Sequence, residues 1–236
     1  MMVPSETRVT LELLGGAVIP KTGQTPLRLE RKTAALLAYL ALEGATPRRV
    51  LVGLLWPNSL ETTARNNLRQ LMRRLRDSAG ADLIAGDDPL MLSTDIAVDA
   101  VQLELSAFAG DDASVIAGGR ELLEGLDFED CSDLMDWLLV KRESLRGLQV
   151  AALERLTDGD ERSGDLRTAL LHAEKLLELD AVSEVAHRRV MRLHYLCGDR
   201  GAALRAYRRC AQVMQRELGV APLPETSALA ASNARR

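Results

Sequence analysis

Residues 63–76 read TARNNLRQLMRRLR, and this stretch decides the fold of the N-terminal part of the chain. At 100° per residue it forms an amphipathic helix with two unlike sides. One side is apolar and carries Leu68, Leu71, Met72 and Leu75. The opposite side carries Asn66, Arg69, Gln70, Arg73 and Arg74, flanked by Arg65 and Arg76. We therefore expect the apolar stripe in a core and the basic side in solvent.

The side chains on that basic side suit double-stranded DNA. Arginine can donate two hydrogen bonds to guanine, asparagine and glutamine pair with adenine in the same way, and a surplus guanidinium neutralises a phosphate. No acidic residue interrupts positions 64–76. A charged helix face is solvated without binding anything about as often as it binds a partner. The position of this helix as the third in its domain is therefore better evidence for DNA binding than its charge.

Two short strands and two short helices are expected before this helix. RVTLELL at 8–14 alternates as a strand does, and LRLE at 27–30 indicates a second strand. Apolar residues then recur at helical spacing over 31–44, and VLVGLLW at 50–56 indicates a second helix.

The second and third helices both have start signals. Thr46 is expected to cap the second helix, with Pro47 at its first position. Asn58 or Ser59 can cap the third helix, and Glu61 in its first turn complements the helix dipole.

The segment DLIAGDDPLMLS, residues 82–93, predicts a β-hairpin around a turn at 86–89. Strands, three helices and a hairpin follow one another as in a winged helix-turn-helix, in which the third helix enters the DNA groove and the hairpin is the wing. Asp87 and Asp88 in the turn would be repelled by phosphates, so contact between this wing and DNA is left open.

The rest of the chain is expected to be helical and to contain a repeat. Gly164-Asp165 and Gly198-Asp199 are offset by 34 residues, the period of tetratricopeptide repeats, whose stacked helix pairs form a concave binding face. Helix breaks are expected at 110–112, 127–132, 157–164, 180–183 and 198–200.

These signals predict a mainly α fold with a small β component. An N-terminal winged helix-turn-helix at 1–98 is followed by a tetratricopeptide-like α-helical domain at 99–226 and a disordered tail at 227–236.

The net charge of −4 conceals an uneven distribution. Between Arg28 and Arg76 ten basic residues stand against three acidic ones, a charge of +7, so the rest of the 236-residue chain carries −11. Such asymmetry is typical of a basic interaction module joined to an acidic one. Backbone NH groups at helix starts favour anions, so phosphate contacts are also expected from Arg31, Lys32, Arg48 and Arg49.

Other functional classes find little support in the sequence. The three cysteines share no short spacing, which predicts free thiols rather than disulfides or a zinc cluster. The histidines lack accompanying ligands, so neither a metal nor another cofactor is expected. No nucleophile-elbow or phosphate-loop motif occurs, and we expect no catalytic residues. No apolar run approaches the roughly 20 residues that span a bilayer, and a cytoplasmic protein is expected. The residues concerned are Cys131, Cys197, Cys210, His172, His187 and His194.

A second arginine group lies in the repeats. Exposed helix faces with acidic neighbours such as Glu184 and Glu217 are one interpretation. The other is a concave site for a protein partner or an anionic small-molecule effector. The group comprises Arg188, Arg189, Arg192, Arg205 and Arg208, with Arg209 beside them.

Two blocks resemble a known family. LLWPNSLETTARNNLRQLMRRLR at 54–76 resembles the Leu-Trp-Pro, Ala-Arg-x-x-Leu and Arg-Leu-Arg pattern of the bacterial transcriptional activator domain regulators, which include the Streptomyces antibiotic regulatory proteins. Residues 184–226 are similar to that family's His-Arg-x-x-Met, Gly-Asp-x-x-x-Ala-Leu and Glu-Leu-Gly-Val-x-Pro signatures. The resemblance implies an OmpR-like winged helix and a helical activator domain that bind promoter DNA and help recruit RNA polymerase, and two copies on direct repeats would be consistent with it.

The function expected from the sequence is therefore a sequence-specific DNA-binding transcriptional regulator, in particular an activator. The alternative is a tetratricopeptide protein–protein adaptor whose winged helix no longer reads DNA. The acidic net charge and the acidic wing keep that alternative open.

Overall fold

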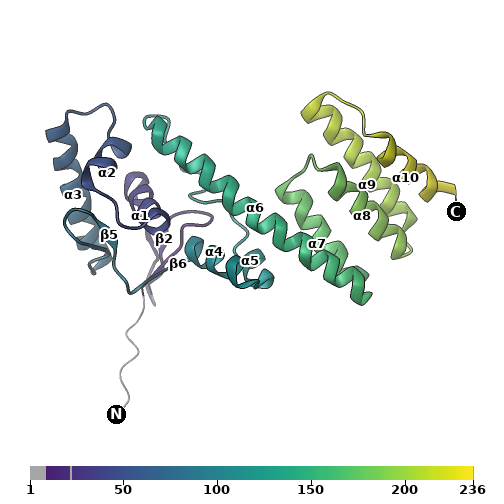
Figure 1. Ribbon diagram of the computed structural model, residues 1–236, viewed down its shortest axis with the longest axis horizontal. Helices are drawn as coiled ribbons and strands as arrows, with labels where there is room; N and C mark the ends of the chain where they lie inside the picture. The colour runs from purple at the N-terminus through teal and green to yellow at the C-terminus, as the bar shows by residue number, and fades with distance from the viewer. Residues whose placement is uncertain (1–8, 22, 236) are drawn as a thin grey trace, which may run out of the picture. The chain divides into compact units, whose positions relative to one another are not determined.

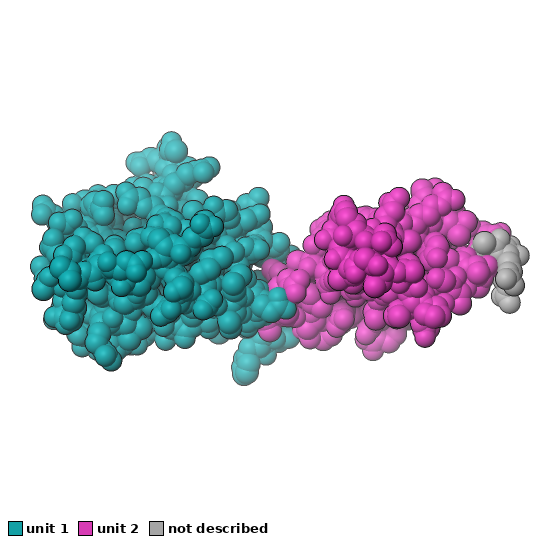
Figure 2. Space-filling model, turned by 90° about the horizontal axis from the view of Figure 1, so that it is seen from above, with its two compact units in different colours: residues 1–145 teal, residues 146–236 magenta. Residues whose placement is uncertain are grey.

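The structure is a computed structural model that describes residues 9–21 and 23–235. Its chain forms two units, residues 1–145 and 146–236, which Figure 2 colours separately. Each unit is treated below by itself. Within the described residues the strands pair into three two-stranded sheets, and the rest of the regular structure is helical. The expected mainly α fold with a small β component is confirmed.

All the strands among the described residues belong to unit 1 (Figure 1). β1 (Val9–Leu11) pairs in parallel with β6 (Ile96–Val98), which joins the two ends of the winged-helix segment. β2 (Val18–Ile19) pairs antiparallel with β3 (Leu27–Arg28). The expected hairpin is formed by β4 (Ile84–Ala85) and β5 (Met91–Leu92). β2 and β6 were not expected, because strands of two or three residues leave almost no periodic signal.

Three helices make the core of the winged helix. α1 (Arg31–Glu43) packs against α2 (Arg48–Leu55) and α3 (Glu61–Ala79), and the three helices lie together in Figure 1. The middle of α1, residues 34–38, is completely buried, so this helix forms the centre of the unit. All three expected helices are confirmed, together with the acidic Glu61 in the first turn of α3.

The expected helix caps are wrong. The hydroxyl of Thr46 donates to the carbonyl of Gly44 (3.0 Å), and its backbone exchanges hydrogen bonds with Leu90 of the hairpin (2.8 and 2.9 Å). Pro47 is the residue before α2 rather than its first residue, and α3 begins after Leu60 without a side-chain cap. Thr46 does not cap because its backbone is held by the hairpin, a contact that local sequence does not reveal.

Unit 1 extends past the expected domain boundary at Val98. α4 (Asp99–Ala109) packs on α5 (Asp112–Ala117), β6 and α1, and the division between the units falls at Leu145 within α6 (Ser132–Ser163). A helix break was expected at 157–164, but α6 continues to Ser163. Within the helix the hydroxyl of Thr157 donates to the carbonyl of Leu153 (2.6 Å).

Unit 2 contains the expected repeat. α7 (Leu166–Leu179) and α8 (Glu184–Leu196) form one helix pair, and α9 (Arg200–Val213), the π-helical turn η1 (Met214–Leu218) and α10 (Pro224–Arg235) continue the array.

The two copies of the Gly-Asp signal have the same geometry. Gly164 and Gly198 have φ of 83° and 84°, a left-handed conformation that favours glycine. The following aspartates cap α7 and α9 by accepting from Thr168 N (3.1 Å) and Ala202 N (2.7 Å). The 34-residue offset therefore marks a real structural repeat.

The expected disordered tail at 227–236 is wrong for the residues up to 235. They continue α10, which packs against α8 and α9 and buries Ala230 and Asn233. Small residues such as Ala and Ser give little apolar periodicity, so the sequence pattern alone did not reveal this helix.

Candidate nucleic-acid interface

The helix α3 has the two unlike sides that its sequence predicts. Leu68, Leu71 and Leu75 are exposed by only 1%, 3% and 5%, and Met72 is half-buried. The side chains on the opposite face are all exposed: Arg65, Asn66, Arg69, Gln70, Arg73, Arg74 and Arg76. We call these seven residues the α3 face. Because the leucines fix the rotation of the helix, the α3 face has a defined direction in solvent.

Most arginines of the α3 face lie near carboxylates. Arg65 pairs with Glu61 and Arg76 with Asp82, while Arg73 lies 4.0 Å from Asp77 and Arg74 lies 3.9 Å from Glu30. The side chains in these pairs are 59–85% exposed. Exposed pairs contribute about 0 to 1 kcal/mol to stability, so a DNA phosphate could replace such a carboxylate at little cost.

Arg69 differs from its neighbours. Within the part of the chain that the structure describes, it makes no ion pair or side-chain hydrogen bond. Asn66 and Gln70 lie next to it on the same face and are likewise exposed. Their donors and acceptors are therefore available to an external partner.

Arg31 and Lys32, expected as phosphate contacts, are used inside unit 1. Arg31 donates to both carboxylate oxygens of Asp130 (2.7 and 3.0 Å) and to the carbonyl of Asp127 (2.8 Å). Lys32 donates to the carbonyl of Leu55 (2.6 Å) and lies 3.4 Å from Asp130. The hydrogen bonds from Arg31 and the nearby charge of Lys32 lower the pKa of Asp130 to about 2. Both cations therefore hold the loop 127–130 in place.

Arg48 is engaged by the wing turn. Its backbone NH donates to Asp88 (2.9 Å), and its guanidinium donates to the carbonyl (2.5 Å) and the carboxylate (2.9 Å) of Asp87. The N-terminus of α2, where a phosphate was expected, thus already holds a carboxylate. Arg49 beside it is exposed and has no charged partner among the described residues. Sequence reasoning missed this contact because Arg48 and Asp87 are 39 residues apart.

The arginines of the second group have several different partners within unit 2. Arg189 pairs with Asp158 and Glu161, and Arg192 pairs with Glu161 (2.5 Å). Arg188 donates to Thr226 (3.0 Å), and Arg205 lies 3.8 Å from Asp199. Arg208 and Arg209 are exposed. Acidic neighbours are present, as one interpretation expected, but they are not Glu184 and Glu217. Glu184 accepts hydrogen bonds from Leu223 and Thr226, and Glu217 accepts one from Arg216.

The histidines and cysteines have separate surroundings. His172 lies 2.8 Å from Asp160, His194 lies 3.7 Å from Glu174, and His187 is buried with a pKa lowered by that burial. Burial raises the pKa of the Cys210 thiol to about 11, and Cys131 is also buried, whereas Cys197 is exposed. The described residues contain no cluster of three metal-ligating side chains, and none of their helices is long and apolar enough to cross a membrane.

The sequence was compared with models of known protein families. The sequence model of the bacterial transcriptional activator domain matches residues 104–232, which is more than half of the chain. The chain belongs to this family. The match starts within α4 and ends within α10, so it follows the winged helix along the chain. The family expected from the two sequence blocks is confirmed.

The fold also has a solved relative. It is similar to Mycobacterium tuberculosis EmbR, solved in complex with a low-affinity phosphopeptide, with a TM-score of 0.64 and 22% sequence identity. The similarity covers 97% of this chain and 65% of the EmbR chain, so the present chain spans about 65% of that relative's length. Comparison with curated proteins gave no match. The expected winged helix followed by a helical domain is confirmed at the level of the fold.

Proposed function

We propose that this member of the family is a transcriptional regulator that binds promoter DNA through the α3 face. The observation that carries the proposal is the exposed set Asn66, Arg69 and Gln70 on a helix whose other side is fixed in the core. The major groove is about 12 Å wide and admits such a helix. Base reading needs side chains held by a rigid element, and the buried leucines provide that rigidity.

The exposed residues divide into two roles. Arg69 reads guanine, because its five donors are not engaged by an acidic neighbour, and Asn66 and Gln70 read adenine. The remaining arginines position the helix by contacting phosphates, and Arg49 adds a contact from α2. The phosphate contacts are assigned to Arg49, Arg65, Arg73, Arg74 and Arg76.

Arg31, Lys32 and the wing turn are left out of this interface. Arg31 and Lys32 are paired with Asp130, and a phosphate that took these cations would leave the Asp130 carboxylate without its partners. Asp87 and Asp88 face Arg48 and the N-terminus of α2, so the turn braces the helix-turn-helix and does not hold a phosphate. The helical domain then serves activation by contacting RNA polymerase or an effector, and two copies of the chain bind direct repeats.

The test selects DNA duplexes from a random pool with the full chain and measures affinity by fluorescence anisotropy. Arg69→Ala should weaken binding of the selected duplex by about 1 to 3 kcal/mol, roughly fivefold to 150-fold, and should change unrelated DNA far less. Arg167→Ala, which removes an exposed arginine of α7, is the matched control and should leave affinity unchanged.

The protein–protein adaptor predicts a different outcome. If no duplex is enriched, or if affinity is indifferent to both Arg69→Ala and Arg73→Ala, the DNA-binding proposal is wrong. The adaptor then becomes the better description of this chain.

A further inference from the structure

A groove of about 420 Å³ lies in unit 2 against the three helices α7, α8 and α9, which are neighbours in Figure 1. Each helix contributes two charged or titratable side chains to its lining. The two members of a pair are four or seven residues apart, so they lie on the same face of their helix. The six residues are Glu174 and Glu178 of α7, His187 and His194 of α8, and Arg205 and Arg209 of α9.

The connection between α8 and α9 fixes which groove residues lie opposite one another. A short turn at Gly198 joins the two helices, which pack against each other. His187 stands 11 residues before Gly198 and Arg209 stands 11 residues after it, so they face each other across an antiparallel pair. At the other end of the groove, Glu174 lies 3.7 Å from His194. The two ends are about 10 Å apart, because seven residues of α8 separate its two histidines.

His187 lines the groove and lacks one hydrogen bond. It is only 2% exposed, and its Nε2 lies 3.0 Å from the carbonyl of Ala181. Since a carbonyl can only accept, Nε2 carries the proton and Nδ1 of the neutral ring is an acceptor. Burial lowers the pKa of His187, and the charge of Arg209 contributes to this, so the ring stays neutral at neutral pH. Nδ1 has no hydrogen-bond partner among the described residues, and a ligand that donates there is therefore favoured.

The two sides of the groove carry opposite charges that are not paired with each other. Arg209 on α9 and Glu178 on α7 are both exposed, and neither makes an ion pair or a side-chain hydrogen bond within the part of the chain that the structure describes. Arg205 lies 3.8 Å from Asp199 in an exposed pair, which holds it only weakly. The groove therefore offers a cation on one side, an anion on the other and an acceptor between them.

We propose that this groove binds an extended segment of a protein partner in which a basic and an acidic residue are adjacent. Successive side chains of an extended chain point to opposite sides, so the basic residue pairs with Glu178 and the acidic residue pairs with Arg209. A backbone NH of the segment supplies the donor that His187 lacks. Three extended residues span about 10 Å, which matches the length of the groove. A wholly acidic segment would face Glu178, and a wholly basic one would face Arg209.

This inference rests on the part of the proposed function that assigns contact with a partner to the helical domain. The test uses the full chain and isothermal titration calorimetry with the blocked peptide acetyl-Ala-Ala-Lys-Glu-Ala-Ala-amide. The peptide should bind, and Glu178→Gln and Arg209→Gln should each weaken it by about fivefold. A peptide with glutamine in place of lysine should be insensitive to Glu178→Gln. A peptide with glutamine in place of glutamate should be insensitive to Arg209→Gln.

The spacing of the two charges provides a control on the peptide. Inserting one alanine between the lysine and the glutamate turns both side chains to the same side of an extended chain. The spaced peptide keeps both charges but can pair only one of them, so it should bind about fivefold more weakly than the adjacent form.

Matched variants provide the controls on the protein. Arg208→Gln removes an exposed arginine that is next to Arg209 but does not line the groove, and it should leave peptide binding unchanged. Glu154→Gln, on the exposed side of α6, should do the same. His187→Gln can keep a donor to Ala181 and removes Nδ1, so it should weaken all the peptides alike. Thermal unfolding identifies any variant that fails to fold, and the exposed positions of Glu178 and Arg209 keep the test decisive if His187→Gln does not fold.

Several results would overturn the proposal. These are no heat of binding at millimolar peptide, equal affinity for the adjacent and spaced peptides, or affinity that is indifferent to both Glu178→Gln and Arg209→Gln. DNA binding gives an independent readout. Arg69→Ala should bind the peptide like the wild type, and Arg209→Gln should bind the selected duplex like the wild type. The groove and the DNA interface can therefore succeed or fail separately.

Discussion

At the scale of single residues, Asp87 shows how a carboxylate from the hairpin turn can engage an arginine of another element. Its side chain is 98% exposed, yet it lies 2.9 Å from the guanidinium of Arg48 at the start of α2. Asp88 accepts from the backbone NH of the same residue. The wing turn thus places carboxylates at the N-terminus of α2, a position that suits a phosphate.

Replacing Asp87 with asparagine should strengthen DNA binding. The change frees Arg48 for a phosphate, so affinity should rise by about twofold to fivefold and the log–log salt slope should steepen by about one contact. Anisotropy titrations at several salt concentrations measure both quantities. Asp95→Asn, in the exposed turn before β6, removes the same charge without a basic partner and should change the slope less. An unchanged affinity in Asp87→Asn would show that Arg48 is not an interface residue.

Asp130 provides a prediction about pH. Its folded pKa of about 2 lies below the ordinary 3.8, so its ionised form stabilises unit 1 above pH 3.8. This contribution should be lost as the pH falls from about 4 to about 2. The difference in thermal midpoint between the wild type and Asp130→Asn should therefore be large at pH 6 and shrink over that window. Asp136→Asn, an exposed aspartate on α6, should show no such convergence.

At the scale of elements, the clearest agreement between sequence and structure is α3. Its apolar and basic sides follow directly from the positions of three leucines and from helical periodicity. The repeat in unit 2 is equally local, since each Gly-Asp pair ends one helix and caps the next. Helix α10 was missed because its alanines and serines pack through small contacts that carry no strong periodic signal.

The two aspartate caps should contribute similarly to stability. Asp165→Ala and Asp199→Ala each remove an accepted hydrogen bond at a helix start, and each should lower the free energy of unfolding by about 1 kcal/mol. Asp→Asn at the same positions should retain most of the cap, since asparagine caps about as well. Urea unfolding followed by circular dichroism makes the comparison, with exposed Glu154→Ala as the neutral reference. A loss in only one of the two variants would contradict equivalent repeats.

At the scale of the whole molecule, the charge distribution bears on the proposed binding of DNA. Residues 28–76 carry +7 and the rest of the chain carries −11. Under the proposed function, the acidic remainder would repel DNA, so affinity would depend on the few phosphate contacts assigned to α2 and α3. The protein is therefore expected to be a selective rather than a general DNA binder.

Salt dependence tests this view of the whole chain. Five phosphate contacts predict a log–log slope of affinity against salt of about −4 to −5 on the selected duplex. Arg73→Ala should make the slope shallower by about one contact, with little change in sequence preference. A slope near zero would mean that the α3 face does not meet phosphates, whatever its net charge.

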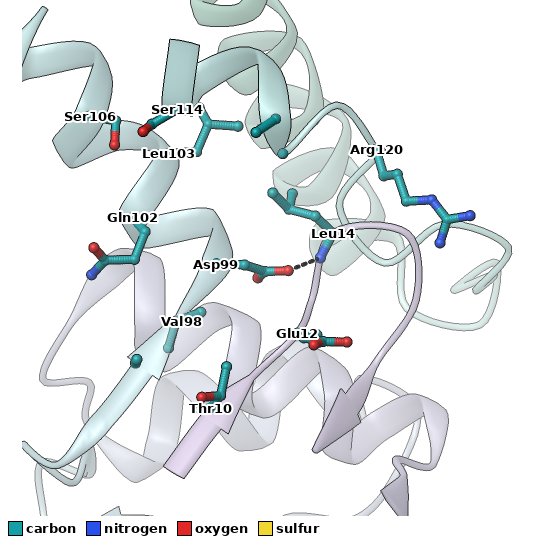
Figure 3. Close-up of a pocket in the computed structure, with 13 residues that line it drawn as sticks. Thr10, Glu12, Leu14, Val98, Asp99, Gln102, Leu103, Ser106, Ser114 and Arg120 are labelled. Atoms are coloured by element: carbon teal, nitrogen blue, oxygen red, sulfur yellow. Dashed lines mark hydrogen bonds between the residues drawn. The ribbon is translucent and has the colours of Figure 1, made fainter. Parts of the chain in front are cut away.

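The sequence by itself determined the helices of the winged helix, the wing hairpin, the repeat period and the exposed set on α3, because each depends on residues within a few turns of one another. Only the tertiary structure decided which cations are free. Arg31 meets Asp130 across 99 residues and Arg48 meets Asp87 across 39, so both are engaged, while Arg69 has no acidic partner among the described residues. A cavity of about 550 Å³ in unit 1 (Figure 3) likewise exists only because β1, β6, α4 and α5 come together. Sequence periodicity predicts which face of a helix or strand a side chain lies on. The residues with which that side chain pairs are determined by long-range packing.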